Sequence, residues 1–128
     1  MNEETRELLR DDILPVVLGN GVAAHQLSSR LLARYGVSCT LCGERRNLLD
    51  FLDMSADFLR LASKSGGRLV AEQLIDFAEL HADRFLLLVP ASDSARAFLR
   101  EQAEILEARF VCVEPSKLEG EWLARIGI

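Results

Sequence analysis

The residues of this sequence that could hold a ligand lie first in a glycine-rich turn. The segment from Gly19 to Ala24, which reads G-N-G-V-A-A, fits the G-x-G-x-x-G/A pattern between an apolar run and a helical one. In such turns the first glycine makes the tight turn, and the second lets a ligand approach the backbone. The helix that follows presents free N–H groups to an anion. Any tight strand-to-helix turn favours glycines, so a purely structural role for Gly19, Asn20 and Gly21 stays open.

Three charged residues about twenty positions further on fit the same interpretation. Glu44 follows a second predicted strand, where a carboxylate could accept a hydrogen bond from the ribose of NAD. Arg45 and Arg46 come next and could instead bind the 2′-phosphate of NADP.

A second candidate segment is the turn Pro90-Ala91-Ser92-Asp93. In a doubly wound sheet, ligands bind where the strand order reverses, outside the carboxyl ends of the first and fourth strands. Those ends would bring Ser92 and Asp93 next to the glycine turn, with His25 one turn into the first helix as a further lining residue. The alternative is that Ser92 or Asp93 only caps the helix that follows.

The three cysteines and the two histidines do not predict a metal or redox site. Cys39 and Cys42 form a C-x-x-C, but they lie in a predicted strand, where residues three apart point to opposite faces. A redox pair would sit at a helix N-terminus, and zinc would need two more ligands at regular spacing. We therefore expect reduced cysteines in a cytoplasmic protein, and no Ser/His/Asp set or carboxylate pair stands out as catalytic.

Composition indicates an acidic, globular single domain. The chain has 128 residues, 49% of them hydrophobic, and its formal net charge is −5. The negative charge argues against nucleic acid as a partner. No apolar stretch approaches the length of a membrane span, and the acidic N-terminus does not resemble a signal peptide.

Alternating patterns along the chain predict the elements that position these residues. Short apolar runs predict five strands, and we place Pro15 at the first residue of the first strand because proline donates no ladder hydrogen bond. Residue Gly36 is expected to end the first long helix. The predicted strands cover residues 13–19, 37–42, 57–62, 85–89 and 109–115, and the predicted helices cover residues 22–35, 47–54, 68–82 and a stretch from 92 to about 106.

This alternation predicts a Rossmann-like α/β fold. We expect a doubly wound sheet of about five mainly parallel strands in the order 3-2-1-4-5, with helices on both faces. The expected organisation is a polar arm or helix at residues 1–12, the Rossmann-like domain at residues 13–118 and a tail at residues 119–128.

Two segments carry a resemblance to a known family. Residues 15–21 (P-V-V-L-G-N-G) and 84–93 (R-F-L-L-L-V-P-A-S-D) together resemble the N-terminal domain that precedes the ATP-grasp fold in carboxylate–amine ligases. That domain occurs in the D-aspartate ligase-like group and, more distantly, in the large subunit of carbamoyl-phosphate synthase. In those proteins a helix rich in arginine and glutamate follows, then a strand that ends in proline. Residues 98–116 follow the same plan, so the resemblance covers residues 13–118.

The resemblance implies a module that lends one wall to a ligase active site, whereas the following domains bind ATP and Mg²⁺. Those domains do not follow here, because the sequence ends at Ile128, shortly after Lys117, where the linker would begin. We therefore expect a fragment, a split-gene subunit or a stand-alone relative that holds no cofactor, is not catalytic alone and works with an ATP-grasp partner. The expected substrate crevice consists of Gly19, Asn20, Gly21, Ser92 and Asp93, with His25 beside it.

Two other classes of function stay open. The first is a stand-alone regulatory Rossmann domain that binds NAD(P) through the glycine turn with Glu44, or with Arg45 and Arg46. The second is an oligomerisation or docking domain, a homo-oligomer included, that uses the acidic residues 1–12 or the tail around Trp122. Trp122 could equally pack back onto the sheet of its own domain.

Overall fold

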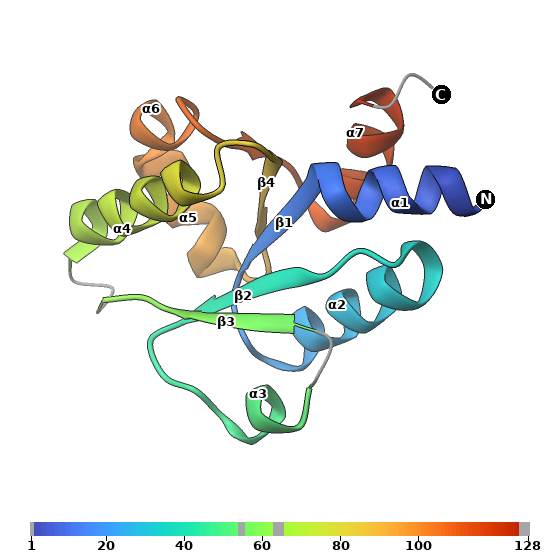
Figure 1. The fold of residues 1–128 in the computed structure, drawn as a ribbon. Helices are drawn as coiled ribbons and strands as arrows, with labels where there is room; N and C mark the ends of the chain where they lie inside the picture. Colours follow the sequence, from blue (N-terminus) through green and yellow to red (C-terminus); the bar gives the residue numbers. More distant parts are fainter. Residues whose placement is uncertain (1, 54–55, 63–65, 126–128) are drawn as a thin grey trace.

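A single parallel sheet forms the centre of the molecule in the computed structural model, which describes residues 2–53, 56–62 and 66–125 (Figure 1). The strand order is β3-β2-β1-β4-β5, and every pairing is parallel. This confirms the predicted α/β class and the order 3-2-1-4-5. The strands are β1 (Ile13–Leu18), β2 (Cys39–Gly43), β3 (Ala56–Arg60), β4 (Phe85–Pro90) and β5 (Val111–Cys112).

Helices cover both faces of the sheet, so the domain has three layers (Figure 1). α1, α2 and α7 contribute to the core on one face, and α4, α5 and α6 contribute to the core on the other. Among the described residues no helix combines the length and the apolar character that a membrane crossing requires. The helices are α1 (Glu3–Asp12), α2 (Val22–Tyr35), α3 (Leu48–Leu52), α4 (Gly67–Leu80), α5 (Asp93–Glu101), α6 (Ala103–Leu106) and α7 (Leu118–Arg125), and a 3₁₀ turn covers Pro115–Lys117.

Strand β1 is central, and all six of its residues are buried. It pairs with β4 along its whole length and with β2 only from Val16 onward. The prediction that Pro15 begins the strand is wrong, because β1 begins two residues earlier, at Ile13. Proline fits at this third position because the ladder with β2 has not yet begun there, so no pairing residue of β2 lies opposite it.

Helix α2 has the predicted bounds and the predicted end. Its apolar stripe, Ala24, Leu27 and Leu31, is buried against the sheet. Gly36 ends it with φ +71°, in the left-handed region, and its N–H donates back to the carbonyls of Leu31 and Leu32. A residue with a Cβ is rarely found in this conformation.

The later part of the chain departs from the prediction in two places. The helix expected from residue 92 to about 106 is interrupted at Gln102, which separates α5 from α6. The fifth strand, expected over residues 109–115, contains only Val111 and Cys112, although the Val113 N–H still donates to the Leu88 carbonyl at 3.0 Å. An edge strand has one neighbour, and Pro115 has no N–H with which to extend the pairing.

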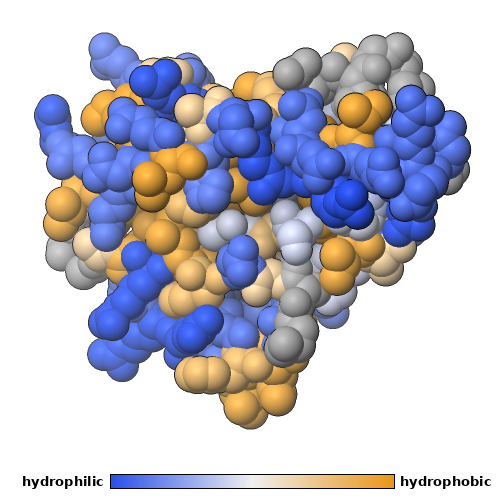
Figure 2. All heavy atoms as spheres, viewed as in Figure 1, coloured by the Kyte–Doolittle hydropathy of each residue, from blue (hydrophilic) through white to orange (hydrophobic). Residues whose placement is uncertain are grey.

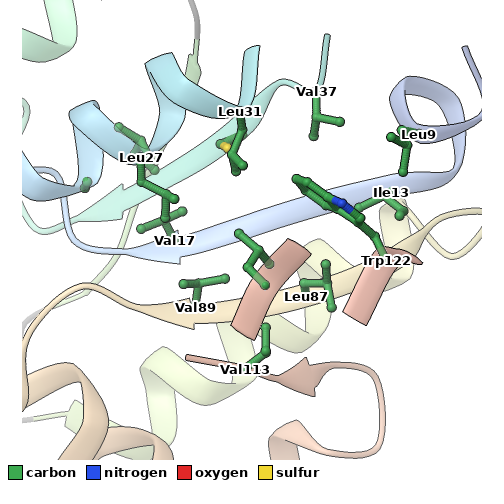
Figure 3. Close-up of a cluster of buried hydrophobic side chains, with 14 residues drawn as sticks. Leu9, Ile13, Val17, Leu27, Leu31, Val37, Leu87, Val89, Val113 and Trp122 are labelled. Carbon is green, nitrogen blue, oxygen red and sulfur yellow. The ribbon is translucent and has the colours of Figure 1, made fainter. Parts of the chain in front are cut away.

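The first and last described helices, α1 and α7, pack into the domain. Leu9 of α1 and Trp122 of α7 are fully buried in the same core cluster (Figure 3). The Trp122 ring contacts Tyr35 edge-on, with the ring centroids 4.8 Å apart. Of the two alternatives for Trp122, the structure shows packing onto the sheet of its own domain, so this side chain is not free to contact a partner.

We predict that Trp122→Ala destabilises the domain by about 3–5 kcal/mol, because it leaves a large cavity in a close-packed core. Urea unfolding followed by circular dichroism measures this change. The matched control is Leu80→Ala, since Leu80 is 81% exposed on α4 and its loss should change stability by less than about 0.5 kcal/mol. Equal effects of the two substitutions would mean that α7 does not pack as described.

Candidate functional site

The glycine turn and the β4–α5 connection lie against each other at the carboxyl edge of the sheet. The Ala91 N–H donates to the Leu18 carbonyl at 3.1 Å, and the Gly19 N–H donates to the Cys42 carbonyl at 2.9 Å. Gly19 has φ +142°, and a Cβ built on it would stand 2.9 Å from the Ala91 Cβ. The first glycine of the motif is therefore required by the backbone and by its close neighbour.

Gly21 differs from Gly19 in its surroundings. It is the N-cap residue of α2, makes no side-chain capping bond and has an ordinary φ of −83°. A Cβ built on it would meet none of the described residues within 4 Å, so the space that they leave beside this backbone is open.

Asn20 links this turn to the β2–α3 connection. Its side-chain Nδ2 donates to the Arg45 carbonyl at 2.7 Å and to Asp50 Oδ2 at 2.8 Å. Its own carbonyl accepts a hydrogen bond from Asn47 Nδ2 at 2.7 Å. The side chain also lies directly over Gly43, where an added Cβ would be only 2.6 Å from Asn20 Oδ1. The space at the carboxyl end of β2 is thus filled by a side chain of the protein itself.

His25 lies between two carboxylates. Its Nε2 is 2.8 Å from Asp50 Oδ1, and its Nδ1 is 2.5 Å from Asp53 Oδ2. The His25 side chain is 10% exposed and that of Asp50 only 2%. A doubly protonated imidazolium donates one hydrogen bond to each carboxylate, so the charged ring fits this position best.

The pKa shifts follow from this geometry. Burial opposes the charge on His25, but hydrogen bonds to Asp53 and Asp50 and their negative charges outweigh it, so the His25 pKa lies above its ordinary 6.5. Burial likewise opposes ionisation of Asp50. Hydrogen bonds from the Asn47 backbone N–H, Asn20 and His25 outweigh that opposition and lower the Asp50 pKa below its ordinary 3.8.

Helix α3 and the residue that follows it supply the two carboxylates, and the first turn of the helix is capped. Asn47 caps it through a reciprocal capping box with Asp50, and Asp53 ends it. Its outer side is apolar and exposed, and in Figure 2 a hydrophobic projection lies over this helix. The exposed apolar residues are Leu48 (72%), Phe51 (66%) and Leu52 (68%).

Ser92 and Asp93 directly follow Ala91, which contacts the glycine turn, and both have local partners. The Ser92 hydroxyl accepts from the Ala95 N–H at 3.2 Å, which is the N-cap bond of α5. The Asp93 carboxylate pairs with Arg96 at 3.1 Å. The structural alternative for Ser92, a helix cap, is confirmed.

Glu44 and Arg45 are exposed on the β2–α3 connection. The Arg45 carbonyl accepts a hydrogen bond from Asn20, whereas Arg45 also lines a pocket of about 630 Å³. The other described residues of that lining are Arg46, Phe58 and Arg60.

The cysteines occupy structural positions. Cys39 and Cys42 belong to core clusters on opposite faces of the sheet, and burial raises the pKa of each thiol to about 12. The described part of the chain contains no group of three His, Cys, Asp or Glu side chains placed to hold a metal ion.

Sequence reasoning missed Asn47, Asp50 and Asp53. The i, i+3 spacing of an N-cap asparagine and an aspartate was visible as a capping-box signal. Nothing in the sequence indicated that these carboxylates would close on His25, more than twenty residues earlier.

Comparison of the chain with family models, with characterised proteins and with solved structures found no match. The site is therefore interpreted from its geometry.

We predict that Gly19→Ala is much more damaging than Gly21→Ala. The first substitution places a Cβ in a conformation that costs about 1–3 kcal/mol in backbone strain alone, and it also collides with Ala91. The second changes only an N-cap preference and should cost less than about 1 kcal/mol. Thermal and urea unfolding of both variants measure the difference, and equal costs would contradict the described turn.

We predict that the pH dependence of stability follows the His25 cluster. Because the His25 pKa is raised on folding, its contribution is complete below its ordinary pKa of 6.5 and is lost as pH rises through the folded value. The contribution of Asp50, whose pKa is lowered, is present above 3.8 and is lost as pH falls through its folded value. The contribution of the cluster to the free energy of unfolding should therefore be greatest between pH 3.8 and pH 6.5, the ordinary pKa values of the two groups.

The variant Asp53→Asn tests the cluster directly. NMR titration of the His25 ring should give a midpoint above 6.5 in the parent protein and a lower one in the variant. Asp57→Asn, at an exposed position of β3, makes the same charge change and should leave the His25 midpoint in place. An unchanged midpoint in Asp53→Asn would show that this carboxylate does not contact the ring.

Proposed function

We propose that this chain is a non-catalytic, substrate-facing Rossmann-like module that works with an ATP-grasp catalytic domain or subunit of a carboxylate–amine ligase, in the cytoplasm. The resemblance of residues 13–118 motivates the choice of family. The observation that carries the proposal is the hydrogen bonding among the polar groups at the carboxyl edge of the sheet. The described polar groups there bond to one another, and none of His25, Asp50 and Asp53 is free to act as a nucleophile or base.

The His25 cluster illustrates this property. Both ring nitrogens face carboxylates, and Asp50 accepts further bonds from Asn20 and from the Asn47 backbone. A general acid or base must reach a proton of the substrate, and here each group is engaged inside the protein. The cluster therefore acts as a rigid support for the β1–α2 turn and for α3.

The exposed apolar side of α3 supports a partner-facing role. Three large apolar side chains lie together on a helix of five residues, and this helix is linked to the glycine turn by the hydrogen bond from Asn20 to Asp50. Contiguous exposed apolar patches on soluble proteins commonly mark contact surfaces. We assign α3 as the contact with the catalytic domains, which would place the Gly21 edge at their active site.

The alternative, a regulatory domain that binds NAD(P) at the glycine turn, fits the geometry less well. Such a ligand places its ribose near the carboxyl end of β2, where Asn20 already lies over Gly43 and makes two hydrogen bonds. A dinucleotide would have to displace that side chain.

We predict that an antibody against this domain detects, in the native source, a denatured protein of roughly three times this size, which corresponds to two or more added domains. The recombinant chain of 14.3 kDa is the size standard. A native product of 14.3 kDa from which no ATP-grasp polypeptide co-purifies would contradict the proposal.

The contact role of α3 is tested in the same native protein or complex. The double substitution Leu48→Ser with Phe51→Ser should reduce ligase activity or co-purification of the catalytic subunit. Leu80→Ser, at an equally exposed apolar position on α4, is the matched control and should have no effect. Similar behaviour of the two variants would exclude α3 as the contact.

A further inference from the structure

The pocket beside the β2–α3 connection is rich in arginine. Of the described residues that line it, three are arginines, Arg45, Arg46 and Arg60, and the other is Phe58. Its volume of about 630 Å³ lies within the usual range of small-molecule sites, about 300–1,000 Å³. In Figure 2, strongly hydrophilic side chains gather over the β2–α3 connection, next to the hydrophobic projection of α3.

These three arginines belong to a chain in which acidic residues are in excess. The sequence has 20 acidic and 15 basic residues, and other arginines use that excess: Arg96 pairs with Glu114, Arg30 with Glu119 and Arg68 with Glu72. Among the described residues no ion pair involves the arginines of the pocket. The pocket thus concentrates positive charge that no carboxylate of the described residues pairs with.

The Arg46 guanidinium, although exposed, lies over two aromatic rings. The Arg46 guanidinium carbon lies 5.2 Å from the centroid of Phe51 and 5.6 Å from that of Phe58. Cation–π contacts at such distances restrain the side chain without neutralising its charge. A guanidinium fixed in this way has less conformational freedom to lose when it binds an anion.

We propose that this pocket binds a small phosphorylated molecule that carries at least two negative charges. Guanidinium groups match the oxygens of phosphate bidentately, and three of them suit a multiply charged phosphoryl group better than a single carboxylate. The half-buried ring of Phe58 provides an apolar wall for the organic part of the ligand. This inference goes beyond the proposed function, because it gives the chain a ligand of its own away from the open backbone of Gly21.

The test is an NMR titration of the ¹⁵N-labelled chain at constant ionic strength, with pyrophosphate and ATP as probes and adenosine and citrate as comparisons. We expect pyrophosphate and ATP to cause saturable shifts at residues 44–46 and 58–60, and adenosine to cause none. The proposal is overturned if neither phosphorylated probe binds more tightly than about 1 mM, if the shifts centre on residues 19–24, or if citrate binds more tightly than pyrophosphate.

Matched arginine variants locate the site. Arg46→Gln and Arg60→Gln should each weaken pyrophosphate binding by about tenfold or more, because each removes a charge-assisted contact. Arg109→Gln makes the same charge change at an exposed position outside the pocket and should leave affinity within about twofold. An equal loss of pyrophosphate affinity in all three variants would indicate a general charge effect and overturn the proposed site. The native-size measurement is independent of these outcomes, so failure of the two proposals can be told apart.

Discussion

The parallel pairing of β1 with both β2 and β4 is the constraint on which the rest of the molecule depends. All six residues of β1 are buried between the two helical layers, so the strand cannot shift without moving both cores. Since its neighbours run in the same direction, the carboxyl ends of the three strands meet at one edge, and the chain must leave β1 between them. Gly19 allows that exit because it adopts φ +142° against Ala91.

The polar groups at this edge are best understood as a consequence of that exit. The turn after β1 brings Asn20 over Gly43 and sets His25 one turn into α2, where it faces Asp50 and Asp53. A buried imidazolium between two carboxylates is stable only while all three groups stay together, since loss of one partner leaves a charge uncompensated. The cluster therefore fixes the position of α3, a helix too short to be stable alone.

The sequence predicted the fold well because the signals for a buried parallel strand are local. The runs around Val16 and Leu88 are apolar on both faces, and Gly36 marks a helix end by its backbone freedom. The candidate site was harder to predict from the sequence. The glycine turn was proposed from its motif and Ser92 from its place after the fourth strand, whereas Asp50 and Asp53 contact His25 between distant segments that no spacing rule encodes. Likewise, Arg60 joined Arg45 and Arg46 only through the pairing of β2 with β3.

The reactivity of the two buried cysteines of β2 depends on whether the sheet is folded. Cys39 and Cys42 face opposite layers, and with pKa values near 12 they carry almost no thiolate at neutral pH. Oxidants and alkylating agents act on the thiolate, so these sulfurs become reactive only when the sheet itself opens. Chemical modification of both cysteines of the C-x-x-C therefore indicates that the sheet has opened and that its two cores have separated.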